Sequence, residues 1–192
     1  MSGANSAKVG LRDQVLTARN RRSLAERAEA AQGLSDQVFS TPEVVTAATV
    51  AAYVSVGSEP GTAITLSNLW HSGIRVILPV LLPDGDLDWA RYEEYEPLAA
   101  APRGLLEPIG PRLGVDAIAT ADLVIVPGLA VSARGDRLGR GGGSYDRALG
   151  RVLVGTPAWV LLYDDEVGRD VPVEPHDRRV TAVVTPSGIH RF

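Results

Sequence analysis

The sequence predicts an α/β protein with a mainly parallel open sheet and helices on both faces, a Rossmann-like three-layer sandwich, preceded by a basic N-terminal helical arm. Short apolar runs alternate with helix-like stretches, as in strand–helix–strand crossover units. The first forty residues instead place apolar side chains at helical spacing. The chain has 192 residues, 45% of them hydrophobic, which suits one domain with a substantial core. We therefore expect a single domain over residues 1–192, with residues 1–40 packing on the core as the arm.

The arm is predicted to contain two helices. Apolar side chains recur through residues 9–16, and Ser23 with Glu26 matches a capping box, so a second helix begins near Ser23. Residues 8–27 carry six basic and two acidic side chains. This excess is typical of a solvated helix face, but it also suits a basic arm laid over an anionic ligand.

The core elements follow from the apolar runs and the turns between them. The predicted strands are residues 49–56, 74–82, 123–126, 158–163 and 180–184, the last being the final strand. The predicted helices are residues 62–72 and 144–152. Residues 83–120, which hold several prolines, are expected to be irregular, apart from a short strand near residues 87–89.

Composition excludes several classes of function. The net charge of −4 argues against bulk electrostatic binding of nucleic acid, which needs a basic excess. The chain has no cysteine, so it has no disulfide, no thiolate metal site and no cysteine nucleophile. Prolines and charges interrupt every apolar run before it reaches membrane-spanning length, and no signal-peptide segment is evident. We expect a cytoplasmic monomer with neither a nucleic-acid nor a membrane partner.

The segment that carries chemistry is residues 122–149. A buried strand runs into a loop with four glycines in five positions, at 139 and 141–143, and a helix follows. Glycine lets backbone N–H groups approach an anion, and a helix N-terminus adds unpaired donors. Arg137 and Arg140 are able to form forked hydrogen bonds to phosphate. The loop matches neither the Walker pattern nor the dinucleotide pattern, so a purely structural turn remains the alternative.

Two further residues suit a phosphate ligand. Asp146 lies in the first turn after the glycines, where a carboxylate is positioned to hold Mg²⁺ or simply to cap the helix. Lys8 is the one lysine beside 18 arginines. Codon bias explains that ratio, yet a retained lysine also suits a compact point charge on a phosphate.

Residues 126–147, VPGLAVSARGDRLGRGGGSYDR, resemble the signature of the 5-formyltetrahydrofolate cyclo-ligase family. Agreement extends to the basic segment 8–12, to Ser55, Glu59 and Thr62 after the first strand, and to Leu-Glu-Pro at 106–108. The run Val-Pro-Val-Glu-Pro-His-Asp at 171–177 agrees as well. The resemblance covers about residues 6–185.

The resemblance implies an enzyme that converts 5-formyltetrahydrofolate and MgATP to 5,10-methenyltetrahydrofolate, ADP and phosphate. The γ-phosphoryl group passes to the formyl oxygen, N10 attacks the resulting iminium phosphate, and phosphate leaves. The implied ATP-binding residues are Lys8, Val9, Gly10, Leu11, Arg12, Arg137, Leu138, Gly139, Arg140, Gly141, Gly142, Gly143, Ser144 and Tyr145. The implied folate-binding residues are Arg12, Val54, Glu59, Arg140, Gly141, Gly142, Gly143 and Ser144. Asp146 and Glu174 are the implied metal ligands, and His176 with Asp177 is expected to be a structural pair.

The chain departs from the family pattern at Ser144, where the first of two paired tyrosines is expected. A ring beside the ligand is therefore missing. Two alternatives follow: a sugar-phosphate isomerase-like enzyme that needs no ATP, and a folate- or nucleotide-binding module that has lost turnover.

Overall fold

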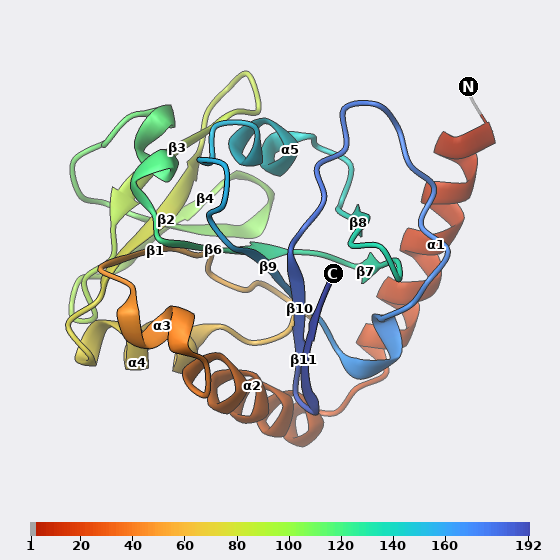
Figure 1. The fold of residues 1–192 in the computed structure, drawn as a ribbon, viewed down its shortest axis with the longest axis horizontal. Helices are drawn as coiled ribbons and strands as arrows, with labels where there is room; N and C mark the ends of the chain where they lie inside the picture. The colour runs from red at the N-terminus through yellow and green to blue at the C-terminus, as the bar shows by residue number, and fades with distance from the viewer. Residues whose placement is uncertain (1–2) are drawn as a thin grey trace.

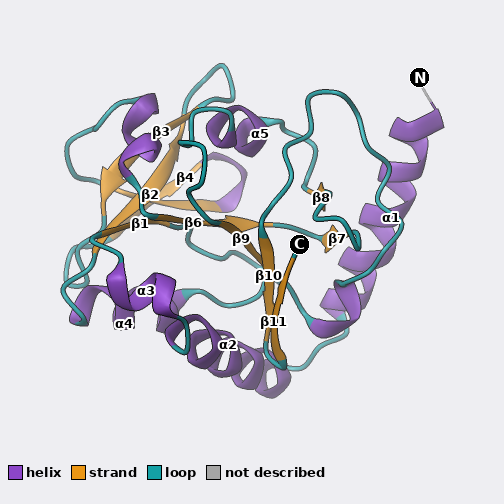
Figure 2. Cartoon of the chain, viewed as in Figure 1, coloured by secondary structure: helices purple, strands orange, loops and turns teal. Residues whose placement is uncertain are grey.

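A seven-stranded sheet with the strand order β11-β10-β9-β6-β1-β2-β3 runs through the middle of the molecule (Figures 1 and 2). The computed structural model describes residues 3–192. The helices are α1 (Gly3–Asn20), α2 (Leu24–Phe39), α3 (Pro42–Thr46), α4 (Ala63–His71) and α5 (Ser144–Leu149). The strands of the sheet are β1 (Thr49–Ala51), β2 (Arg75–Leu81), β3 (Leu87–Arg91), β6 (Leu123–Pro127), β9 (Ala158–Leu161), β10 (Ala182–Thr185) and β11 (Gly188–Arg191). Two ribbons lie outside it: β4 (Leu98–Ala101) with β5 (Leu105–Pro108), and β7 (Ala130–Val131) with β8 (Arg137–Leu138).

The five inner strands of the sheet are parallel, and the two edge strands, β3 and β11, are antiparallel to their neighbours. Apart from polar residues at strand ends, namely Thr49, Arg75 and Thr185, the inner strands are apolar because both faces of a parallel sheet are buried. In β6, for example, Leu123, Val124, Ile125 and Val126 are all at most 1% exposed. The predicted mainly parallel sheet is therefore confirmed.

Helices cover both faces of the sheet, as predicted. Leu34 and Val38 of α2, with Leu66 and Leu69 of α4, pack on one face. On the other face, α5 contributes Ala148 and Leu149, beside the short 3-10 helix of residues 115–120. In Figure 1 the first group lies below the sheet and α5 lies above it.

The two halves of the predicted arm occupy different places. Helix α1 stands beside the sheet (Figure 1), where Val15 packs against Leu129 and Leu138 of the β7–β8 region. Helix α2 is one layer of the sandwich and begins after Ser23, which makes the predicted capping box with Glu26. Residues 1 and 2 of the predicted arm lie outside the described residues.

Three predictions about the elements are corrected by the structure. The first strand is only Thr49–Ala51, since the chain leaves the sheet after that point. The short strand expected near residues 87–89 is present as β3. The rest of residues 83–120, expected to be irregular, also contains the β4–β5 ribbon, and β11 follows the strand that was predicted to be last. The ribbon and β11 were not predicted because their residues are mostly exposed or half-buried, which leaves no apolar run or clean alternation.

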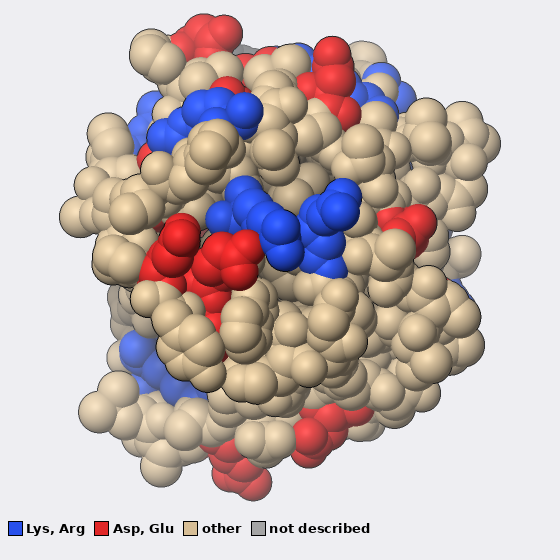
Figure 3. All heavy atoms as spheres, turned by 90° about the vertical axis from the view of Figure 1, so that its left-hand side faces the viewer, with Lys and Arg blue, Asp and Glu red and all other residues tan. Residues whose placement is uncertain are grey.

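The surface carries both signs of charge. On the face shown in Figure 3, basic and acidic side chains lie in neighbouring groups, and no single sign covers it. Within residues 3–192, no helix combines the length and the apolar composition that crossing a bilayer requires.

A buried ion pair joins α1 to the segment after β9. Arg19 is fully buried, and its Nε and Nη2 donate to the two carboxylate oxygens of Glu166, each at 2.7 Å. Arg19 Nη2 also donates to the carbonyl oxygen of Gly128 at 2.8 Å, and Glu166 accepts the Tyr163 N–H at 3.0 Å. The pair thereby ties the helix to two loops at the carboxyl ends of strands.

We predict that Arg19→Met lowers the free energy of unfolding by about 3–5 kcal/mol, because it leaves the Glu166 carboxylate buried and unpaired. Denaturant unfolding monitored by circular dichroism measures the change. The double variant Arg19→Met/Glu166→Gln should recover much of the loss, since glutamine is neutral and still accepts the Tyr163 N–H. A single variant within about 1 kcal/mol of wild type would show that the pair does not stabilise the fold.

Candidate active site

A cavity of about 990 Å³ opens at the carboxyl ends of the central strands. Its floor comes from the segment after β1, with Tyr53, Val54 and Glu59, and from Pro127 and Gly128 at the end of β6. Strands β1 and β6 are neighbours in the sheet, and β2 lies on the other side of β1, so the strand order reverses here. Ligands of open α/β sheets bind at such a crevice.

The glycine loop forms one wall of the cavity and is held by α1. Gly141 and Gly143 have φ values of +97° and +69°, which side chains with a Cβ rarely adopt. Arg12 Nε donates to the Gly139 carbonyl at 2.9 Å, and a Cβ on Gly141 would lie 3.2 Å from Arg12 Nη2. Glycine is therefore needed at 141 both for its φ and for the close approach of Arg12.

Two arginines of the glycine loop are held in place by hydrogen bonds. The guanidinium of Arg137 donates to the Pro127 carbonyl at 3.2 Å and to Asp146 Oδ1 at 3.1 Å, while its buried Nε has no partner among the described residues. Arg140 donates to Glu59 Oε1 at 3.1 Å. The loop cations are thus oriented by carboxylates before any ligand binds.

Lys8 reaches the cavity from α1 and lies between two carboxylates. Its Nζ is 2.7 Å from Glu174 Oε2 and 2.6 Å from Asp177 Oδ2, and Lys8 is 5% exposed. Burial opposes the charge on Lys8, but hydrogen bonds to Asp177 and Glu174 outweigh it and raise the Lys8 pKa. Burial likewise opposes the charge on Asp177, yet the hydrogen bond from Lys8 lowers its pKa. Both groups are therefore ionised at neutral pH.

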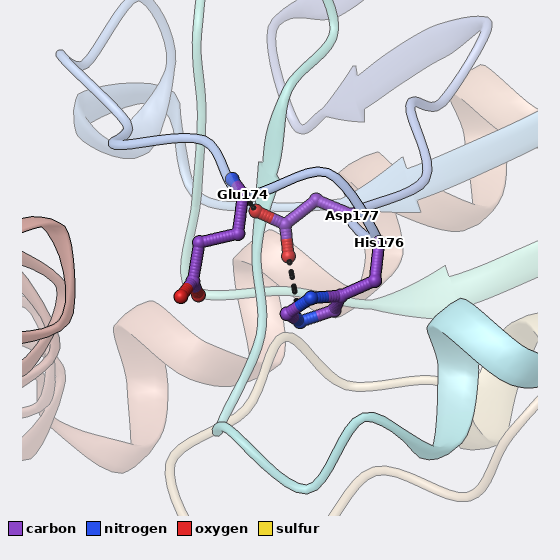
Figure 4. Close-up of side chains that lie close together, drawn as sticks. All are labelled: Glu174, His176 and Asp177. Atoms are coloured by element: carbon purple, nitrogen blue, oxygen red, sulfur yellow. Dashed lines mark hydrogen bonds and ion pairs between the residues drawn. The ribbon is translucent and has the colours of Figure 1, made fainter. Parts of the chain in front are cut away.

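The loop between β9 and β10 carries the acidic end of the cavity. Figure 4 shows Glu174, His176 and Asp177 on this loop, with His176 Nε2 3.6 Å from Asp177 Oδ1. One ligand atom from each of the three lies within 4.8 Å of the others. Asp146 lines the same cavity, and the hydrogen bonds that it accepts from described residues both end on Oδ1. Asp146 is not one of that group of three. Carboxylate oxygens are the ligands that Mg²⁺ prefers, so the chemistry of Glu174, Asp177 and Asp146 suits that ion.

Two tyrosines and a serine complete the wall. Tyr53 is 3% exposed and its hydroxyl has no partner among the described residues; burial, reinforced by the charge of Glu59, raises its pKa well above the ordinary value. Burial also raises the pKa of Tyr145. Ser144, where the family pattern has tyrosine, donates its hydroxyl to the Gly85 carbonyl. At this position, a hydrogen bond between the glycine loop and the β2–β3 turn therefore takes the place of the tyrosine ring of the family pattern.

The structure brings most of the predicted site residues together. Those that line the cavity are Lys8, Arg12, Val54, Glu59, Arg137, Leu138, Gly139, Arg140, Gly141, Gly142, Gly143, Ser144, Tyr145, Asp146 and Glu174. Three do not: Val9 and Gly10 lie on the exposed side of α1, and Leu11 packs toward the β7–β8 ribbon.

Sequence reasoning did not predict that several further residues line the cavity or contact its charged groups. Asp177 contacts Lys8 as directly as Glu174 does, and its place in the Val-Pro-Val-Glu-Pro-His-Asp run was the available signal. Tyr53, Arg103 and Arg178 also line the cavity, and no local pattern distinguishes them from other tyrosines and arginines.

Comparisons with known proteins show what this chain is similar to. The family model described as the 5-formyltetrahydrofolate cyclo-ligase family matches residues 4–186. A 5-formyltetrahydrofolate cyclo-ligase of Mycolicibacterium smegmatis is 39% identical over 185 residues, which cover 94% of each chain. The Escherichia coli K12 protein of the same name is 34% identical over 85% of this chain and 92% of its own. The NMR structure of Aquifex aeolicus 5,10-methenyltetrahydrofolate synthetase superposes with a TM-score of 0.83 at 28% identity, covering 96% of this chain and 92% of that one.

Proposed function

Because the chain belongs to the 5-formyltetrahydrofolate cyclo-ligase family, we propose that it uses ATP and Mg²⁺ to convert 5-formyltetrahydrofolate to 5,10-methenyltetrahydrofolate. The observation that carries this proposal is the convergence of the glycine loop, the basic face of α1 and Glu59 on one cavity. Its volume of about 990 Å³ is at the upper end of the roughly 300–1,000 Å³ usual for ligand sites. That size suits two substrates bound side by side.

The cavity divides into two subsites in this proposal. The glycine loop, with Arg12 and Arg137, takes the triphosphate, because free backbone N–H groups and guanidinium forks suit phosphate oxygens. Val54 and Glu59 take the folate, where the carboxylate accepts from the pterin N–H groups. The Arg140–Glu59 ion pair links the subsites, so the residues of one substrate's subsite orient those of the other.

The reaction needs the formyl oxygen to become a leaving group. Attack of that oxygen on the γ-phosphorus forms an O–P bond and breaks the bond to the ADP oxygen. N10 then attacks the formyl carbon, the C–O bond breaks, and inorganic phosphate leaves with both electrons of that bond, while the proton of N10 passes to the departing phosphate. Charge on the phosphoryl oxygens is stabilised by Arg137, Arg140 and the loop N–H groups, and most of the catalytic effect is positioning of this kind.

Asp146 and Glu174, joined by Asp177, are the residues that would hold Mg²⁺ in this proposal. When bound, Mg²⁺ neutralises charge on phosphate oxygens that otherwise repel these carboxylates. Lys8 offsets one of the two negative charges of Glu174 and Asp177 in the free protein, and we infer that its ammonium turns toward the phosphates when ATP binds.

The direct test is an absorbance assay for methenyltetrahydrofolate. Product should form only when 5-formyltetrahydrofolate, ATP and Mg²⁺ are all present, and one ADP should appear for each product. Removal of the metal by EDTA should stop the reaction, and added Mg²⁺ should restore it. Folate binding without product would instead identify a binding module that has lost turnover.

We predict that Lys8→Met raises the KM for ATP at least about tenfold, the scale of one charge-assisted hydrogen bond. Methionine keeps the buried stem of the side chain and removes the charge. Steady-state kinetics at saturating folate measure the effect. Arg191→Met is the matched control, since it removes one positive charge that pairs with Glu43 away from the cavity. An unchanged KM in the Lys8 variant would contradict a phosphate contact.

We further predict that Asp146→Asn lowers kcat at least about a hundredfold and raises the Mg²⁺ concentration needed for half-maximal rate, because it removes a charged metal ligand. Asparagine still accepts from Arg137 and from the Arg178 N–H, so the melting temperature should change little. Mn²⁺ binding followed by electron paramagnetic resonance provides a second readout. If Asp146 serves only to orient Arg137, the variant will stay active with an unchanged metal requirement.

A further inference from the structure

Arg103 lies at the tip of the β4–β5 ribbon in an unusual backbone conformation. Its φ is +63°, and within residues 3–192 it is the one non-glycine residue with positive φ. A Cβ makes this conformation unfavourable, and such residues cluster at ligand-binding sites, where the strain persists because it aims a side chain. The next residue is Gly104, so a glycine lies beside the strained position but does not occupy it.

The strained conformation places the Arg103 side chain opposite the glycine loop. Both line the cavity, and a Cβ built on Gly142 would lie 3.8 Å from Arg103 Nη1. The ribbon is anchored at its base, because the Leu81 N–H at the end of β2 donates to Glu107 Oε1 at 2.9 Å. Arg103 is therefore carried to the cavity by a ribbon that is fixed to the sheet.

The Arg103 guanidinium has no hydrogen bond or ion pair to any other described residue. Other cations of the cavity are held: Lys8 by Glu174 and Asp177, and Arg140 by Glu59. Among the described residues, eight basic and five acidic side chains line the cavity, although the whole chain has a net charge of −4. The cavity therefore has positive charge that its own carboxylates do not neutralise, which suits an anionic ligand.

We propose that Arg103 is a substrate-binding residue that clamps an oxyanion between the β4–β5 ribbon and the glycine loop. The oxyanion is either a phosphate of the nucleotide or a carboxylate of the folate glutamate, since guanidinium forks bind both. The proximity to Gly142 favours the phosphate. This inference rests on the proposed function for the identity of its two substrates.

The test is Arg103→Gly, which removes the guanidinium and relieves the backbone strain together. The melting temperature should stay equal to wild type or rise, because glycine adopts this φ freely. Calorimetry should show the affinity for one ligand falling about tenfold or more, the scale of a charge-assisted hydrogen bond. Loss confined to a non-hydrolysable ATP analogue with Mg²⁺ assigns the phosphate, and loss confined to 5-formyltetrahydrofolate assigns the carboxylate. A residue with a purely structural role would lose stability and leave both affinities unchanged.

Arg112→Gln is the matched control. Arg112 donates to the Pro108 carbonyl at the base of the same ribbon and does not line the cavity, so both affinities should match wild type. If Arg103→Gly lowers the melting temperature, Arg103→Asn repeats the test with a residue that also tolerates positive φ. Affinities within twofold of wild type in a folded Arg103 variant would overturn the clamp. A wild-type protein that binds neither ligand would instead overturn the proposed function.

Discussion

The cavity depends on one face of helix α1. The residues on this face, at spacings of four, three and four, are Lys8, Arg12, Val15 and Arg19. Arg19 is locked into Glu166 at one end, Val15 packs on the β7–β8 region, and Arg12 and Lys8 reach the cavity at the other end. Because Arg19 is fully buried, α1 cannot shift along its axis without leaving a buried charge unpaired. A single ion pair therefore sets the position of two cations that lie two to three helical turns away.

Carboxylates hold several of the cavity's cations in place before a ligand binds. Asp146 orients Arg137, Glu59 orients Arg140, and the same carboxylates are those expected to face metal or folate. Exchanging either ion pair for a ligand contact costs little free energy, because the cation has an oxygen partner before and after the exchange. Preorganisation of this kind is what a phosphoryl-transfer site requires, because donors that are already aimed need no reorganisation during the reaction. Arg103, like Arg12, has no carboxylate partner among the described residues; its position is set by its backbone, so its charge is available to a ligand.

The sequence by itself determined the layered fold and the chemical character of the loop. Strands such as β6 and β9 are apolar throughout, and the glycines at 139–143 are adjacent in the chain, so both signals are local. The family signature, residues 126–147, includes these glycines. Fifteen of the predicted site residues, some within the signature and some outside it, line one cavity. The exceptions, Val9, Gly10 and Leu11, have a simple cause: a helix turns 100° per residue, so neighbours of Lys8 and Arg12 face away.

Only the tertiary structure decided what each charged side chain contacts. Arg19 and Glu166 are 147 positions apart, and Lys8 and Asp177 are 169 apart, so no local pattern links them. The Tyr53 hydroxyl, which has no partner within residues 3–192, and the strained Arg103 have the same origin, because burial, pairing and φ are set by segments far away in the chain. The β4–β5 ribbon that carries Arg103 is half-exposed, and a half-exposed ribbon leaves no hydrophobic period to detect. Residue type thus established which chemistry was available, whereas long-range packing established which groups are already paired and which are free to bind.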